Sequence, residues 1–174
     1  MPRTKFHYLA LFVTIAGPLM GGAPLRAQGD CSVMEKALKD ASAKTHVTPT
    51  HVYITSKIGG RTFTSEMIYA AGSMYMKING KWSLGGSIKD IEQAEQQNTQ
   101  HNSKDTCSSV KDDTVNGEIA SLYGSHSETA KGNIDLQVWI SKAHGLPLRE
   151  ETNSDGGKAV ISTRYEYGDV KPPL

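Results

Sequence analysis

Six histidines and two cysteines are the residues of this chain whose types best suit metal or covalent chemistry. The histidines are His7, His46, His51, His101, His126 and His144. They form no i, i+4 pair, no His-Glu-x-x-His motif and no zinc spacing with a cysteine. A site folded from His46, His51 and His126 stays open, because ligands need not be neighbours in sequence, but solvated histidines are the interpretation that we favour. We therefore expect no metal site and no cofactor.

A hydrolase-like set of letters occurs at Ser125-His126-Ser127-Glu128. Adjacent residues of a strand point to opposite faces, so they cannot pass a proton in series. The carboxylate pair Glu150 and Glu151 diverges for the same reason. The sequence also has no Gly-x-Ser-x-Gly motif and no phosphate-binding loop. We predict no catalytic residues and a protein that is not an enzyme, although an apolar pocket with a few polar groups remains able to catalyse.

The first residues have the pattern of a secretory signal peptide. An apolar run from Tyr8 to Met20 follows Arg3 and Lys5 and precedes a small residue, Ala27. The run is shorter than the roughly 20 residues that a membrane helix needs. We expect residues 1–27 to be a signal peptide cleaved near Ala27, residues 28–174 to form a single domain, and no integral membrane segment to remain. The predicted location is the periplasm or the outside of the cell.

The charge of the remaining chain argues against a nucleic-acid partner. Removal of Arg3, Lys5 and Arg26 lowers the count of basic residues from 19 to 16, against 18 acidic residues. The resulting charge of −2 provides no basic surface for phosphates.

The two cysteines are expected to form a disulfide. Outside the cytosol, Cys31 and Cys107 face an oxidising environment, and their bond closes a loop that contributes about 4 kcal/mol on a chain-entropy estimate. Two unconnected buried thiols are the alternative.

The hydrophobic pattern predicts helices and strands in a definite order. Ser32 and Glu35 fit a capping box for a helix over about Val33 to Ala43, and a second helix is expected over about Ile88 to Gln97. Strands joined by Gly59-Gly60, Gly72 and Asn79-Gly80 follow Thr50, and later strands are expected at Cys107 to Lys111, Glu118 to Glu128, Ile134 to Ser141, Leu146 to Thr152 and Lys158 to Val170. This order predicts an α+β fold, in which two helices cover the concave face of a curved antiparallel β-sheet.

Two segments resemble a known family. Met74 to Trp82 and Val138 to Arg149, the latter containing Trp139-Ile140, Lys142 and Gly145-Leu146-Pro147, are similar to hairpins of the periplasmic LolA-like group. That group includes carriers of lipoproteins and lipids. The resemblance implies an incomplete, LolA-like half-barrel and a lipid or a lipidated protein as a possible partner.

Methionine and aromatic residues concentrate in the early strands. Methionine adapts to irregular apolar shapes, including ligand tails. The candidate ligand-binding residues are Phe63, Met67, Tyr69, Met74, Met76 and Trp82. Core packing beneath the two helices is the simpler interpretation of the same residues, and an apolar cavity under a helical lid is the functional one.

Two functions therefore remain in view. The first is a non-enzymatic carrier that holds a lipid, an acyl chain or a lipidated peptide between sheet and helices. The second is a cell-envelope interaction module with a solid core, which pairs with a protein partner through an exposed face or a sheet edge.

Overall fold

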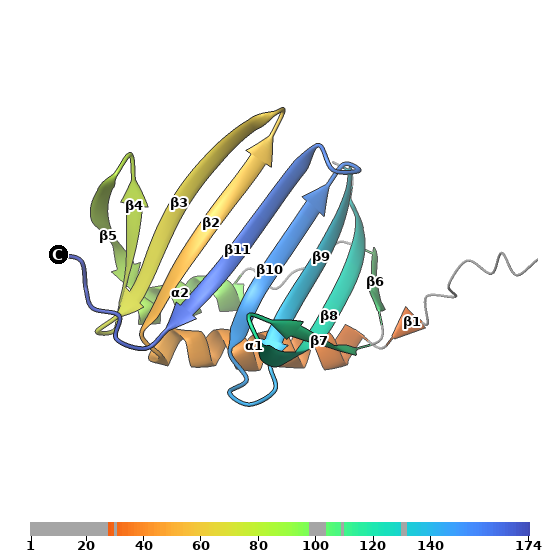
Figure 1. The fold of residues 1–174 in the computed structure, drawn as a ribbon, viewed down its shortest axis with the longest axis horizontal. Helices are drawn as coiled ribbons and strands as arrows, with labels where there is room; N and C mark the ends of the chain where they lie inside the picture. Colours follow the sequence, from red (N-terminus) through yellow and green to blue (C-terminus); the bar gives the residue numbers. More distant parts are fainter. Residues whose placement is uncertain (1–27, 30, 98–103, 109, 130–131) are drawn as a thin grey trace, which may run out of the picture.

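The computed structural model describes residues 28–29, 31–97, 104–108, 110–129 and 132–174 (Figure 1). The predicted signal peptide lies outside the described residues. The elements of the described chain are β1 (Gln28–Gly29), α1 (Cys31–Val47), β2 (Thr50–Ile58), β3 (Arg61–Ala70), β4 (Ser73–Ile78), β5 (Lys81–Ser87), α2 (Ile88–Gln97), β6 (Lys104–Ser108), β7 (Lys111–Val115), β8 (Glu118–Thr129), β9 (Gly132–Ser141), β10 (Pro147–Ser154) and β11 (Ala159–Tyr167).

Short turns connect β2 to β5 as the sequence predicts. Between β4 and β5, Asn79 and Gly80 both have positive φ angles, 51° and 78°, as a type I′ hairpin requires. Their two-residue turn pairs Ile78 with Lys81 and Lys77 with Trp82.

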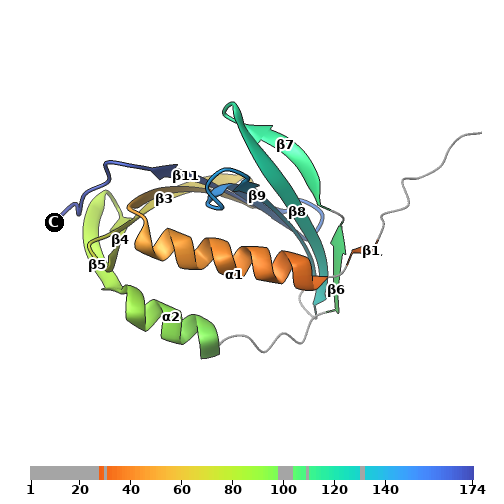
Figure 2. The ribbon, with the colours of Figure 1, turned by 90° about the horizontal axis from the view of Figure 1, so that it is seen from below.

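All strands join one antiparallel sheet in the order β1-β6-β8-β9-β10-β11-β2-β3-β4-β5, with β7 pairing to β8. The long pair between β11 and β2 matches Tyr167 with Thr50 and Ala159 with Ile58, and it joins the two meanders. The sheet is curved and does not close on itself (Figure 2). The predicted α+β fold with an incomplete half-barrel is confirmed.

The structure corrects two predicted elements. The segment expected to be one strand at Cys107 to Lys111 is divided between β6 and β7, which pair with successive parts of the longer strand β8. The first helix is longer than predicted and begins at Cys31, one residue before the expected cap, and continues to Val47. Its extra turn buries Thr45 and His46, polar residues that a search for apolar periodicity does not count. Pro49 ends it, because the residue before a proline disfavours helical geometry.

Helix α1 packs directly on the sheet. Ala41 contacts a core that includes Val138 and Ile140 of β9. Cys31 at the start of the helix forms the predicted disulfide with Cys107 of β6, with their Cα atoms 5.2 Å apart. We call the face of the sheet that α1 covers the helix face, and the opposite one the outer face.

Helix α2 lies on the same side but farther from the sheet than α1 (Figure 2). Ser87 caps its first turn: the Ser87 hydroxyl accepts from the Asp90 amide at 3.2 Å and donates to the Asp90 carboxylate at 2.7 Å. The two helices meet where His46 Nδ1 lies 3.4 Å from Glu92 Oε1. In the described part of the chain, neither helix combines the length and apolar character of a membrane span.

Candidate functional site

Apolar side chains are exposed on the helix face, near those ends of the strands that lie beyond α1. They come from β9, β11, β2 and β3, and we call them the apolar strip: Ile134, Ile161, Ile58 and Phe63. Their exposed fractions are 36%, 37%, 50% and 54%. Such exposure is unusual for residues on the same face as a protein core, and contiguous exposed apolar surface marks binding sites.

The pairing register places these four residues in two adjacent rows, with small residues between them. Ile134 pairs with Ser154, Ser154 with Ala159, and Ala159 with Ile58. In the next row, Thr152 pairs with Ile161, which pairs with Ser56, which pairs with Phe63. Directly paired residues share a face of the sheet, so the strip crosses five strands.

The strip is exposed because α1 covers only part of the strands. The helix packs against Val138 and Ile140, toward the far end of β9 from Ile134. Figure 1 shows the strands continuing well past α1 on the side of the turns between β2 and β3 and between β10 and β11. Residues near these turns keep the apolar pattern of a core, but neither of the two described helices covers them.

Five of the six predicted ligand-binding residues share the helix face. Met67 pairs with Met76, and Tyr69 pairs with Met74. The Tyr69 ring lies 5.7 Å from the His46 ring of α1, which identifies this face. Phe63 follows by strand alternation, four residues before Met67.

Trp82 lies on the outer face, away from the other five. It pairs with Lys77, the neighbour of Met76, so the two side chains point to opposite faces. The two-residue turn at Asn79-Gly80 fixes this register, and the sequence therefore contained the signal that separates Trp82 from the methionines.

One carboxylate lies on the helix face beside the strip. Glu150 of β10 pairs with Val138 on one side and with Thr163 on the other. The Tyr165 hydroxyl donates a hydrogen bond to Glu150 Oε2 at 3.3 Å. Burial raises the pKa of Glu150, and the hydrogen bond from Tyr165 opposes this shift.

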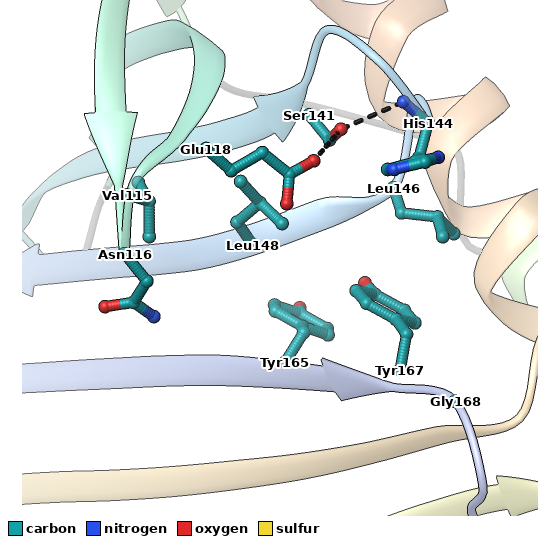
Figure 3. A pocket seen from close by; sticks show the side chains of 10 residues that line it. All are labelled: Val115, Asn116, Glu118, Ser141, His144, Leu146, Leu148, Tyr165, Tyr167 and Gly168. Atoms are coloured by element: carbon teal, nitrogen blue, oxygen red, sulfur yellow. Dashed lines mark hydrogen bonds between the residues drawn. The ribbon is translucent and has the colours of Figure 1, made fainter.

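A cavity of about 450 Å³ lies where β10 separates from β11 (Figure 3). The two strands pair only from Arg149 and Arg164 onward, so the start of β10 is unpaired on this side. The Tyr167 hydroxyl donates to the carbonyl of Pro147 across the gap. The lining is Val115, Asn116, Glu118, Ser141, His144, Leu146, Leu148, Tyr165, Tyr167 and Gly168.

Three polar groups of this cavity form hydrogen bonds with one another. The Ser141 hydroxyl donates to Glu118 and accepts from the His144 amide at 2.9 Å. Figure 3 shows these contacts at one end of the cavity and the two tyrosines at the other. The serine hydroxyl is held by a carboxylate rather than by an imidazole, which is not the arrangement of a nucleophile and its base.

The outer face carries a row of charged and aromatic side chains. In the order of pairing across the sheet, this outer ladder is Trp139, Arg149, Arg164, Tyr53, Glu66, Lys77 and Trp82. A second cavity, of about 790 Å³, is lined by part of the ladder together with Asp113 to Asn116 of the β7–β8 hairpin. Neither cavity is lined by a residue of α1 or α2, or by any of the six predicted ligand-binding residues.

Members of the outer ladder are paired with one another. The guanidinium of Arg149 lies 4.8 Å from the Trp139 ring, and that of Arg164 lies 4.1 Å from the Tyr53 ring. Glu66 accepts from Lys77 at 2.8 Å. Such contacts stabilise the sheet and leave these groups few free positions for a ligand.

The histidines considered as metal ligands lie apart from one another. His46 is near Glu92, His51 bonds Glu66 at 2.9 Å, and His126 Nδ1 bonds Asp135 at 2.7 Å. Within the described residues, no three metal-ligating side chains gather at one place. His126 pairs with Asp135 across to β9, while Ser125 and Ser127 face the other way, as strand alternation predicts.

Comparison with known proteins gives structural likenesses only. No protein-family model matches the sequence, and no curated protein matches it. The chain is similar to crystal structures of LprF from Mycobacterium bovis (12% identity, TM-score 0.46, covering 82% of this chain and 96% of that one) and of the lipoprotein LppX from Mycobacterium tuberculosis (11%, 0.48, 82% and 99%). It is also similar to a LolA superfamily protein from Nitrosomonas europaea (8% identity, TM-score 0.33, covering 80% and 94%). The last of these structures is a member of the group that two segments of the sequence resemble.

Sequence reasoning missed Ile58, Ile134 and Ile161 of the strip, and it considered Glu150 only as a carboxylate that diverges from Glu151. Strand alternation places these isoleucines on the same face as buried residues such as Val52 and Val138, so no local pattern marks them as exposed. Their exposure depends on where α1 crosses the sheet, which the local pattern does not contain.

Proposed function

We propose that this protein is a non-enzymatic carrier that binds the acyl chain of a lipid or a lipidated peptide on the apolar strip, outside the cytosol. One observation supports it above all others: four apolar side chains are exposed in two adjacent rows on the helix face, beyond the reach of α1. Shielding them from water by an apolar ligand is favourable, at about 25 cal/mol per Å² of buried apolar surface.

The dimensions of the strip favour a chain rather than a compact ligand. Neighbouring strands lie about 4.8 Å apart, so five strands extend over about 19 Å. This is the length scale of an extended acyl chain. The side chains between the isoleucines, Ser56, Thr152 and Ser154, are small and polar without being charged.

The compartment is supported by the disulfide. A bond between Cys31 and Cys107 persists in oxidising surroundings, such as the periplasm or the extracellular space. The signal peptide that would direct the chain there remains a prediction from the sequence.

The decisive experiment compares two adjacent residues of β3. Phe63→Asp places a charge in the strip, whereas Thr64→Asp places the same charge on the outer face, where Thr64 lines the larger cavity. We expect Phe63→Asp to weaken the binding of the neutral dye Nile red at least about tenfold, which corresponds to about 1.4 kcal/mol. Thr64→Asp should bind the dye as the unchanged protein does.

The opposite pattern, with Thr64→Asp alone weakening the dye, would place the ligand in the outer cavity instead. Absence of dye binding, together with native mass spectra of bare polypeptide only, would favour the interaction module with a solid core. Chemical denaturation of both variants provides the control for folding, because exposed substitutions are expected to change the unfolding free energy by less than about 0.5 kcal/mol.

A further inference from the structure

Glu150 is the one carboxylate that the described residues of β9, β10, β11, β2 and β3 place on the helix face. Alternation along these strands assigns to that face the even-numbered residues of β9, β10 and β2 and the odd-numbered residues of β11 and β3. Apart from Glu150, the charged residue in this set is Arg61, which ends the row at the turn between β2 and β3. A single acid is therefore set into a surface that is apolar and hydroxylated apart from Arg61 at its edge.

The partner of Glu150 is a hydroxyl group and not a cation. Tyr165 donates to Glu150 Oε2 at 3.3 Å. Burial raises the pKa of Tyr165 far above neutrality, so its hydroxyl stays protonated and remains a donor. The neighbouring Glu151, on the outer face, instead forms an ion pair with Arg149.

Glu150 lies within reach of a ligand on the strip. It is two residues from Thr152, which pairs with Ile161 of the strip, and two residues along a strand correspond to about 7 Å. Its other neighbour, Thr163, adds a hydroxyl at the same level of the sheet. A chain lying along the strip would thus end or bend beside an acceptor oxygen flanked by hydroxyl groups.

We infer that Glu150, held by Tyr165, selects the head group of the bound amphiphile and favours heads that donate hydrogen bonds, such as amines, alcohols and amides, over free carboxylates. A donor head forms a charge-assisted hydrogen bond to the Glu150 carboxylate, which is stronger than a neutral one. A fatty-acid carboxylate placed beside it meets a like charge on a poorly solvated surface, which disfavours its ionised form. This inference depends on the proposed carrier function and specifies its ligand class.

The test uses probes with one chain and three heads: dodecylamine, dodecanol and dodecanoate, each competing with Nile red at neutral pH. The measured quantity is the ratio of the dodecanoate affinity constant to those of the other two. An alcohol leaves water more readily than a carboxylate, whatever the protein. The ratio of affinity constants measured in Glu150→Gln contains this difference and therefore serves as the reference. We expect the preference for the donor heads to fall at least about fivefold in Glu150→Gln, which corresponds to the difference of about 1 kcal/mol between charged and neutral hydrogen bonds.

Glu151→Gln is the matched control. It removes the same charge from the adjacent residue on the outer face, and its head-group preference should equal that of the unchanged protein. If the unchanged protein prefers dodecanoate, or if Glu150→Gln retains the full preference, the inference is wrong while the carrier function stands. If none of the three probes displaces the dye, the carrier function fails and the head-group inference fails with it. The series on the unchanged protein decides the first outcome even if Glu150→Gln does not fold.

Discussion

The two faces of strands β9, β10, β11, β2 and β3 differ in how far their side chains are already paired. On the outer face, Arg149, Arg164 and Glu66 have aromatic or charged neighbours in the ladder. On the helix face, side chains under α1 are buried, but those beyond it, such as Ile58 and Phe63, have no helix above them. The same strands therefore carry one face whose contacts are satisfied within the chain and one face that keeps apolar surface for something else. The larger cavity lies on the first face, so cavity size alone points to the wrong place.

The largest effect is expected from removing the disulfide, which tests whether this bond is needed to hold α1 over the covered part of the helix face. Replacing Cys31 and Cys107 together by Ala should lower the free energy of unfolding by about 4 kcal/mol, because the bond closes a loop with a sequence separation of 76. Urea denaturation of the oxidised protein and of the variant measures the difference. Addition of a reductant should lower the stability of the parent and leave that of the variant unchanged. Equal stability of parent and variant would show that packing alone positions α1.

The boundary between the covered and the uncovered part of the helix face can be measured on one strand. Ile140 is 7% exposed and Ile134 is 36% exposed, both on the helix face of β9. Ile140→Ala should cost about 2–4 kcal/mol through lost burial and a cavity under α1. Ile134→Ala should cost less than about 1 kcal/mol and should instead weaken Nile red binding. Denaturation and dye titration of the pair provide both values. Equal costs would mean that Ile134 belongs to the packed core and not to the strip.

The carboxylates of the two faces should respond to pH with opposite signs. Burial raises the pKa of Glu150 above its ordinary value of 4.5, so the folded protein holds this proton more tightly than the unfolded chain does. The ionised Glu150 therefore costs stability above its raised pKa, and the cost disappears as the pH falls below 4.5. Glu150→Gln should stabilise the protein at neutral pH and have no such effect in acid.

Glu66 provides the contrast on the outer face. The hydrogen bond from Lys77 is the main cause that lowers the pKa of Glu66 below 4.5. Its contribution to stability is present above pH 4.5 and is lost as the pH falls through the lowered pKa. Glu66→Gln should therefore destabilise the protein at neutral pH and less so in acid. Denaturation curves at neutral and acid pH for both variants make the comparison, and a shared sign would remove the distinction between the faces.

Local sequence signals were sufficient for most of the elements. Alternation along β9 and the turn residues Gly59-Gly60 and Asn79-Gly80 marked strands and hairpins, since their backbone requirements are local. The pairing of the only two cysteines followed from the compartment and is present in the structure. The division of the chain near Cys107 was missed because β6 and β7 are short and polar, without an apolar pattern to delimit them.

The parts of the candidate site that escaped prediction depend on contacts between distant segments. The pair between β11 and β2 joins residues more than 100 positions apart, such as Tyr167 and Thr50, and no local pattern encodes it. The exposure of Ile134 depends on the line along which α1 crosses β9. The face on which Trp82 lies, by contrast, is fixed by a turn that is visible in the sequence. Counting residues outward from Asn79-Gly80 pairs Trp82 with Lys77 and so places it on the face opposite Met76.

Helix α1 is attached to the sheet at both of its ends, by the disulfide to β6 and by the two residues Thr48 and Pro49 that lead into β2. Its 17 residues make a rod of about 25 Å, and the six strands from β6 to β2 span about 24 Å at their usual spacing. The rod thus acts as a brace of fixed length across those six strands. Strands β3, β4 and β5 lie beyond the covalent attachment of α1 to β2, and α1 reaches β3 only through packing, as between the His46 and Tyr69 rings. The sheet is therefore divided into a part between two covalent attachments and a wing held by its ladder and by packing. Phe63 is the one member of the strip on the wing, and it faces three isoleucines on the braced part.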